Sequence, residues 1–126
     1  MANSKKTILI IDDEKNLSRV LELQLTELGY KVIIAIDGKD GLAKAKEEKA
    51  DLIILDLILP KMPGEEVCRQ IRKDECICKT PIIMLTAKTQ DADRVIGRVI
   101  GANCYLTKPF DWAVLIEQIK MLTREV

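Results

Sequence analysis

Apolar and polar positions follow two patterns along the chain. Short runs that are apolar at nearly every position predict strands buried on both faces, because a strand with one exposed face would carry a polar residue at every second position. Such runs bounded by polar or turn-forming residues are typical of the inner strands of a parallel sheet. Five runs fit this description, at residues 7–11, 31–36, 51–56, 81–85 and 104–107.

Between these runs the apolar residues recur at spacings of three and four, which predicts amphipathic helices. Glycines at 29 and 101 are placed to end two of the helices, since glycine readily takes the left-handed conformation that follows a helix. The predicted helices cover Leu17–Leu28, about 39–48, 64–73, Ala92–Ile100 and Trp112–Leu122.

Strand and helix therefore alternate five times, which predicts an α/β protein with a parallel sheet between two layers of helices. Right-handed crossovers leave few topologies for such a chain. We expect the flavodoxin-like (βα)5 doubly wound fold with strand order 2-1-3-4-5, in which ligands bind beyond the carboxyl ends of the strands. The length of 126 residues fits one domain, residues 1–126.

Composition narrows the classes of function. Twenty basic and 20 acidic residues give a net charge of zero, which argues against bulk electrostatic attraction to nucleic acid or to anionic lipid. The absence of histidine removes every mechanism that needs an imidazole base or ligand in this chain. No apolar run approaches the roughly 18 residues that a membrane span requires, so we expect a cytoplasmic protein.

Polar residues with useful chemistry stand at the carboxyl ends of the predicted strands. Because parallel strands end at the same edge of a sheet, we expect these side chains to lie close together. They are Asp12, Asp13 and Glu14 after the first strand, Asp56 at the end of the third, Thr86 after the fourth and Lys108 after the fifth.

This set suits phosphoryl chemistry. Clustered carboxylates repel one another unless a cation lies among them, and Mg²⁺ is the abundant hard cation with oxygen ligands. Asp56 could then act as a nucleophile toward phosphorus. Lys108 could bind a phosphate oxygen, and Thr86 could donate a hydrogen bond.

Each residue also has an ordinary structural interpretation. Asp12 could cap a helix, Asp56 could form a turn, Lys108 could be a solvated surface charge, and Thr86 could be chosen for its β propensity. These separate interpretations do not explain why such residues follow four neighbouring strands, so the site is the better hypothesis.

Five short motifs in order carry a resemblance to a known family. The chain resembles the receiver domain of two-component response regulators over nearly its whole length. The motifs are Ile11-Asp12-Asp13-Glu14, Leu55-Asp56-Leu57, Met62-Pro63-Gly64, Leu85-Thr86-Ala87-Lys88 and Tyr105-Leu106-Thr107-Lys108-Pro109-Phe110.

The resemblance implies a role for each acidic residue. Asp56 is expected to accept a phosphoryl group from the phosphohistidine of a sensor kinase or a phosphotransfer protein. Asp13 and Asp56 are expected to bind Mg²⁺ directly, Asp12 through water, and Ile58 through its backbone carbonyl. A rival interpretation is a receiver-like protein-binding module that is never phosphorylated.

The resemblance also implies a switch. Thr86 and Tyr105 are the expected switch pair, Lys108 is expected to contact the phosphoryl group, and the Lys108–Pro109 peptide is expected to be cis. The face of helix four, strand five and helix five would change, and an effector protein or a fused output domain would read it. Direct binding of nucleic acid or membrane by this domain is not expected.

Two positions bear on turnover and one segment on assembly. An aspartyl-phosphate phosphohydrolase needs a second aspartate where Ile58 stands, so we expect no enzyme beyond self-phosphorylation and self-dephosphorylation. Ile58 is apolar and cannot orient a water, and charged Lys88 can donate a hydrogen bond but cannot act as a base. We therefore expect slow hydrolysis of the acyl phosphate and a long-lived phosphorylated state. Asn103-Cys104 replaces two acids found in many transcription-factor receivers, which weakens the case for their usual dimer.

Overall fold

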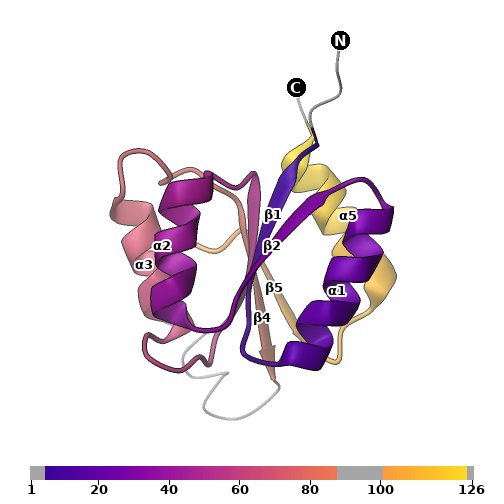
Figure 1. Ribbon diagram of the computed structural model, residues 1–126, viewed down its shortest axis with the longest axis horizontal. Coiled ribbons are helices and arrows are strands. Elements are labelled where there is room, and N and C mark those ends of the chain that lie inside the picture. The colour runs from indigo at the N-terminus through magenta and orange to yellow at the C-terminus, as the bar shows by residue number, and fades with distance from the viewer. Residues whose placement is uncertain (1–4, 88–100, 125–126) are drawn as a thin grey trace.

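The computed structural model describes residues 5–87 and 101–124, which form a parallel sheet with helices on both faces (Figure 1). The strand order is β2-β1-β3-β4-β5, as the sequence predicted. The strands are β1 at Thr7–Ile11, β2 at Lys31–Ala35, β3 at Leu52–Asp56, β4 at Ile82–Ala87 and β5 at Cys104–Lys108.

Helices cover both faces of this sheet. In Figure 1, α1 and α5 lie on one side of the strands, and α2 and α3 lie on the other. The helix predicted at Ala92–Ile100 lies outside the described residues. The helices are α1 at Lys15–Glu27, α2 at Gly38–Glu48, α3 at Gly64–Lys73 and α5 at Trp112–Thr123.

Alternate residues of the central strands supply two separate cores. Ile8 and Ile10 of β1 pack on the side of α1 and α5, together with Leu21 and Leu115. Leu9 and Ile11 belong to the opposite core, which Val67 of α3 completes. Every residue of β3 is buried, so this strand has no polar face, as its continuous apolar run predicted.

Two strands, β4 and β5, run slightly beyond their predicted ends at the edge that matters for function. β4 continues to Ala87 because Thr86 pairs with Thr107 and Ala87 pairs with Lys108. β1 and β3 pair in register up to Ile11 and Leu55, so the residues that follow them emerge side by side.

Among the described residues, none of the helices has the length and apolar composition needed to cross a membrane.

Candidate functional site

Three carboxylates meet where β1 and β3 end. Asp12 and Asp13 follow β1, and Asp56 is the last residue of β3. One carboxylate oxygen from each lies within 4.8 Å of the others. Asp12 is 1% exposed and Asp56 is 7% exposed, whereas Asp13 is exposed. The predicted convergence of these side chains is therefore present.

Lys108, the last residue of β5, reaches into this cluster. Its Nζ lies 2.9 Å from Asp12 Oδ2, 3.3 Å from Asp56 Oδ2 and 3.5 Å from Glu14 Oε1. One ammonium thus offsets part of the repulsion among three carboxylates. The contact with Glu14 was not predicted from the sequence, although this residue directly follows the two aspartates.

Backbone turns fix one oxygen of each buried aspartate. Asp12 Oδ1 accepts a hydrogen bond from the Glu14 N–H at 2.9 Å, and Asp56 Oδ1 accepts one from the Ile58 N–H at 3.2 Å. The other oxygen of each faces Lys108. The capping residue of α1 is Glu14, so Asp12 is not the helix cap that its ordinary interpretation suggested.

A glycine holds the chain close behind Asp56. A Cβ on Gly64 would lie 2.2 Å from the Asp56 carbonyl oxygen, too close for any side chain. The Gly64 N–H donates to the Leu57 carbonyl at 2.9 Å, which brings the start of α3 against the end of β3. The Met62-Pro63-Gly64 motif therefore shapes the loop that follows the candidate nucleophile.

The electrostatics of the site are those of a crowded acidic pocket. The pKa of Asp56 is raised to about 6, mainly by burial and also by the charge of Asp12, while Lys108 and the Ile58 N–H oppose the shift. Burial alone would lower the pKa of Lys108, but its hydrogen bond to Asp12 and the charges of Asp12 and Asp56 raise it overall. A further positive charge would favour the ionised form of Asp56.

The remaining predicted residues lie on β4, on β5 and in the loop after β3. Thr86 is buried at the end of β4, and its Oγ1 donates to the Ala87 carbonyl at 3.2 Å. Tyr105 on β5 is half-buried against the core next to α3. Ile58 has a side chain that is 57% exposed. The Lys108–Pro109 peptide is cis, as expected, and Lys88 lies outside the described residues.

The donor set fits Mg²⁺ on chemical grounds. All three candidate ligand groups are carboxylates, the hard oxygen donors that this cation prefers, and Asp13 is open to solvent so that a bound cation could keep waters. The partners of Lys108 show that this pocket already accommodates a positive charge.

Comparison with known proteins shows the family to which the chain belongs. Residues 8–120 match the family model for the response regulator receiver domain. The chain belongs to this family. Response regulator ArlR of Staphylococcus aureus is 49% identical over 117 residues, which cover 93% of this chain and 52% of ArlR. The alkaline phosphatase synthesis transcriptional regulatory protein PhoP of Bacillus subtilis is 44% identical over 119 residues, which cover 94% of this chain and 49% of PhoP.

Solved structures show the same fold. The receiver domain of the sensor histidine kinase PA1611 from Pseudomonas aeruginosa has a TM-score of 0.87 and 32% identity, and the match covers 97% of this chain and all of that one. That structure holds a magnesium ion coordinated in its active site cleft. This chain spans about half the length of the curated relatives it matches.

Proposed function

We propose that this receiver domain, residues 1–126, is a phosphorylation-dependent cytoplasmic switch of a two-component system. In this proposal Asp56 accepts a phosphoryl group from the phosphohistidine of a sensor histidine kinase or a phosphotransfer protein. The observation that carries the proposal is the position of Asp56. It is nearly buried at the end of the central strand, between two further carboxylates and the ammonium of Lys108.

The transfer is an in-line displacement at phosphorus. An oxygen of the Asp56 carboxylate forms a bond to phosphorus, while the bond from phosphorus to the donor's imidazole nitrogen breaks. The imidazole keeps the bonding electron pair and takes a proton from solvent, and the product is an acyl phosphate on Asp56. Above its pKa of about 6, Asp56 is mainly the carboxylate that this step requires.

The acidic residues would hold the metal. Asp13 and Asp56 bind Mg²⁺ directly in this proposal, Asp12 binds through water, and Ile58 contributes its backbone carbonyl. Bound Mg²⁺ supplies positive charge that offsets the negative charge of the carboxylates and of the incoming phosphoryl group. Lys108 is close enough to the acceptor to turn from the carboxylates to a phosphoryl oxygen.

A short local change would convert phosphorylation into a signal. Thr86 Oγ1, which donates to the adjacent Ala87 carbonyl, turns to donate to the phosphoryl group. Tyr105 moves further inward, and the surface formed by helix four, β5 and α5 changes. An effector protein or a fused output domain reads that surface, without direct binding of nucleic acid or membrane by this domain.

The rival function is a receiver-like binding module that is never phosphorylated. Such a module has no need of the acceptor, the neighbouring acids or the lysine. Here Asp12, Asp13, Asp56 and Lys108 are all present and lie together, which supports phosphorylation. The domain catalyses only its own phosphorylation and dephosphorylation, since Ile58 cannot serve as an acid or base.

Intact mass spectrometry tests this function. The protein is incubated with acetyl phosphate and Mg²⁺, and one phosphate adduct is expected. Asp56→Asn should carry no adduct. Asp51→Asn is the matched control, because Asp51 directly precedes the same strand at its other end, where its Oδ2 accepts the Thr7 N–H at 2.7 Å. Absence of an adduct on the wild-type protein would favour the binding module.

A further inference from the structure

The loop from β3 to α3 turns through a strained residue. Residues 57–63 connect Asp56 to the start of α3, and Lys61 in this loop has a backbone φ of 67°. The Met62 N–H donates to the Pro60 carbonyl at 2.7 Å, so Lys61 is the central residue of a three-residue turn. Positive φ is unfavourable for a residue with a side chain, whereas glycine takes it readily. Something must therefore hold Lys61 in this conformation.

The connection between β2 and α2 contacts this turn. Lys61 Nζ lies 3.6 Å from Asp37 Oδ2, and the Gly38 N–H donates to the Pro60 carbonyl at 3.3 Å. A Cβ on Gly38 would lie 2.0 Å from the Met62 carbonyl oxygen, so no side chain fits between the two connections. The turn is thus bound through both its backbone and the side chain of its central residue.

Asp37 is fixed in place independently of Lys61. It is buried at the start of α2, where its Oδ1 accepts the Asp40 N–H at 2.7 Å. Its Oδ2 faces Lys61, whose side chain is 68% exposed. Because the carboxylate is already ordered, forming this ion pair restricts fewer side-chain rotamers than pairing two free side chains.

The loop is closed at its base, which couples the turn to the acceptor. The Gly64 N–H donates to the Leu57 carbonyl at 2.9 Å and ties the two ends of the loop together. Leu57 is buried, and the next residue, Ile58, donates its N–H to Asp56 Oδ1 at 3.2 Å. Since the ends are held, a change of φ at Lys61 has to be taken up by the residues between them, and Ile58 is one of these.

We propose that Lys61 is a positioning residue for the metal site. Its left-handed turn, held by Asp37, sets the path of residues 57–63 and with it the position of the Ile58 backbone carbonyl. The inference rests on the proposed function, in which that carbonyl is a ligand of Mg²⁺. Lys61 acts through the backbone, and its ammonium serves to hold the turn against Asp37.

Two substitutions at residue 61 separate the turn from the charge. Lys61→Gly and Lys61→Val both remove the ammonium and its ion pair with Asp37. Glycine takes positive φ readily, whereas the branched Cβ of valine strongly disfavours it. In titration calorimetry, Lys61→Gly should bind Mg²⁺ at least as tightly as wild type, and Lys61→Val at least about tenfold more weakly than Lys61→Gly.

Removal of the partner charge tests the role of the ion pair. Asp37→Asn keeps an oxygen that can cap α2 but loses the charge that faces Lys61, so Mg²⁺ affinity should fall by about threefold. In the Lys61→Gly background the same substitution should leave the affinity unchanged, because glycine needs no ion pair to keep the turn.

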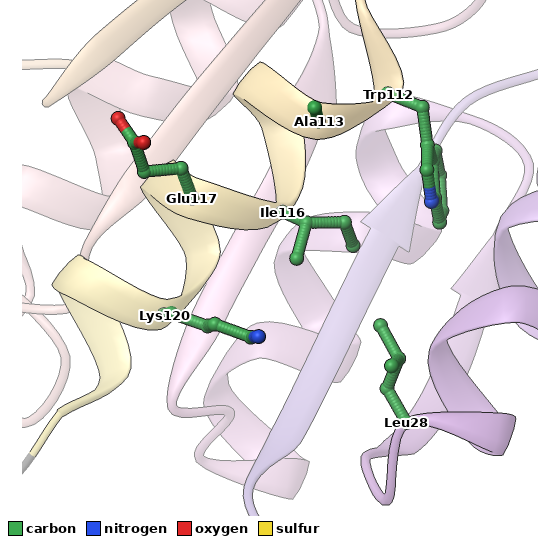
Figure 2. A pocket seen from close by; sticks show the side chains of 6 residues that line it. All are labelled: Leu28, Trp112, Ala113, Ile116, Glu117 and Lys120. Carbon is green, nitrogen blue, oxygen red and sulfur yellow. The ribbon is translucent and has the colours of Figure 1, made fainter.

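Lys120→Ala controls for the loss of a positive charge. Figure 2 shows Lys120 on α5, directed toward the side of Leu28, and in Figure 1 α5 lies on the other side of the strands from α2 and α3. This variant should bind Mg²⁺ as wild type does. Urea unfolding in metal-free buffer supplies a second readout, in which the midpoint should rise for Lys61→Gly and fall for Lys61→Val.

The results distinguish this inference from the proposed function. Equal Mg²⁺ affinities for Lys61→Gly and Lys61→Val would overturn the positioning role, and so would an effect of Asp37→Asn that persists beside Lys61→Gly. If wild type still carries the phosphate adduct in that case, the proposed function stands without the positioning role. A wild-type protein that neither binds Mg²⁺ nor carries an adduct would overturn both.

Discussion

The carboxyl ends of the strands (the carboxyl edge of the sheet) and their amino ends (the amino edge) differ in how charges are balanced. At the carboxyl ends of the strands, three carboxylates share a small pocket, and one lysine only partly balances them. At the amino ends, one cation is surrounded by neutral acceptors. Like charges at the first edge oppose folding, whereas the second edge holds separate segments together.

Arg72 at the end of α3 organises the amino edge. Its Nη1 donates to the Cys78 carbonyl at 2.8 Å and to the Thr80 carbonyl at 2.7 Å, both in the segment before β4. Its Nε donates to the Gly101 carbonyl at 2.8 Å, close to the start of β5. One guanidinium thus joins a helix end to the segments that lead into two strands.

The difference between the edges separates stability from function. A charge surrounded by satisfied hydrogen bonds stabilises the fold and does no chemistry. A group of crowded, incompletely balanced carboxylates costs stability, but it binds a cation and activates an aspartate. We therefore expect substitutions at the amino edge to destabilise the domain and neutralising substitutions at the carboxyl edge to stabilise it.

The largest expected effect is at the amino edge. Arg72→Met removes all the hydrogen bonds of the guanidinium, and we expect the free energy of unfolding to fall by about 3 kcal/mol in urea titrations. Arg69→Met is the matched control on the same helix, because its guanidinium pairs with Glu66 on the surface; it should cost below about 0.5 kcal/mol. Equal losses for the two variants would contradict the special role of Arg72.

Asp56→Asn is expected to raise the free energy of unfolding, in contrast to Arg72→Met. The pKa of Asp56 is about 6 in the folded protein and 3.8 for an ordinary aspartate, so the folded state binds the extra proton between these values. The free energy of unfolding therefore falls as pH rises from about 4 through 6. In metal-free buffer at pH 7.5, Asp56→Asn should be more stable than wild type by about 2 kcal/mol. Urea unfolding at pH 5 and 7.5 measures this, and a variant less stable than wild type at pH 7.5 would refute it.

Magnesium should restore part of the stability that the crowded carboxylates of the carboxyl edge cost the domain. Excess Mg²⁺ is expected to raise the free energy of unfolding of wild type by about 1 to 2 kcal/mol, because the cation binds only the folded state. Asp13→Ala should lose most of this gain and most of the Mg²⁺ affinity in titration calorimetry. Glu47→Ala, an exposed acid on α2, is the control. Unchanged affinity in Asp13→Ala would exclude Asp13 as a ligand.

The smallest effect is expected on the lifetime of the acyl phosphate. Ile58 is more than half exposed beside the acceptor and cannot orient a water. The double variant Ile58→Asn with Lys88→Glu should lose its phosphoryl group about fivefold faster than wild type after removal of the donor. Intact mass followed over time measures the decay. An equal or slower decay would show that these positions do not set the lifetime.

The sequence predicted the carboxyl edge far better than the amino edge. Asp12, Asp56 and Lys108 were found because each stands at the carboxyl end of a predicted strand, and the ends of parallel strands meet. The strand order followed from the alternation of elements. The extension of β4 to Ala87 was missed, since Thr86 and Ala87 gain their partners only from β5.

No pattern in the sequence predicts the role of Arg72. Its acceptors are backbone carbonyls, which every residue type supplies, and they lie in segments that only the tertiary fold brings to the end of α3. The contact of Glu14 with Lys108 was missed for a related reason, because it joins residues 94 positions apart whose spacing no local rule relates. Helix four falls outside the described residues.

The most direct test of the account is to locate the phosphoryl group. After incubation with acetyl phosphate and Mg²⁺, borohydride reduces an aspartyl phosphate to homoserine, and peptide mass spectrometry then identifies the reduced residue. The account predicts homoserine at position 56 alone. Reduction at Asp12 or Asp13 instead, or equal reduction in Asp56→Asn, would contradict the assignment of Asp56 as the acceptor.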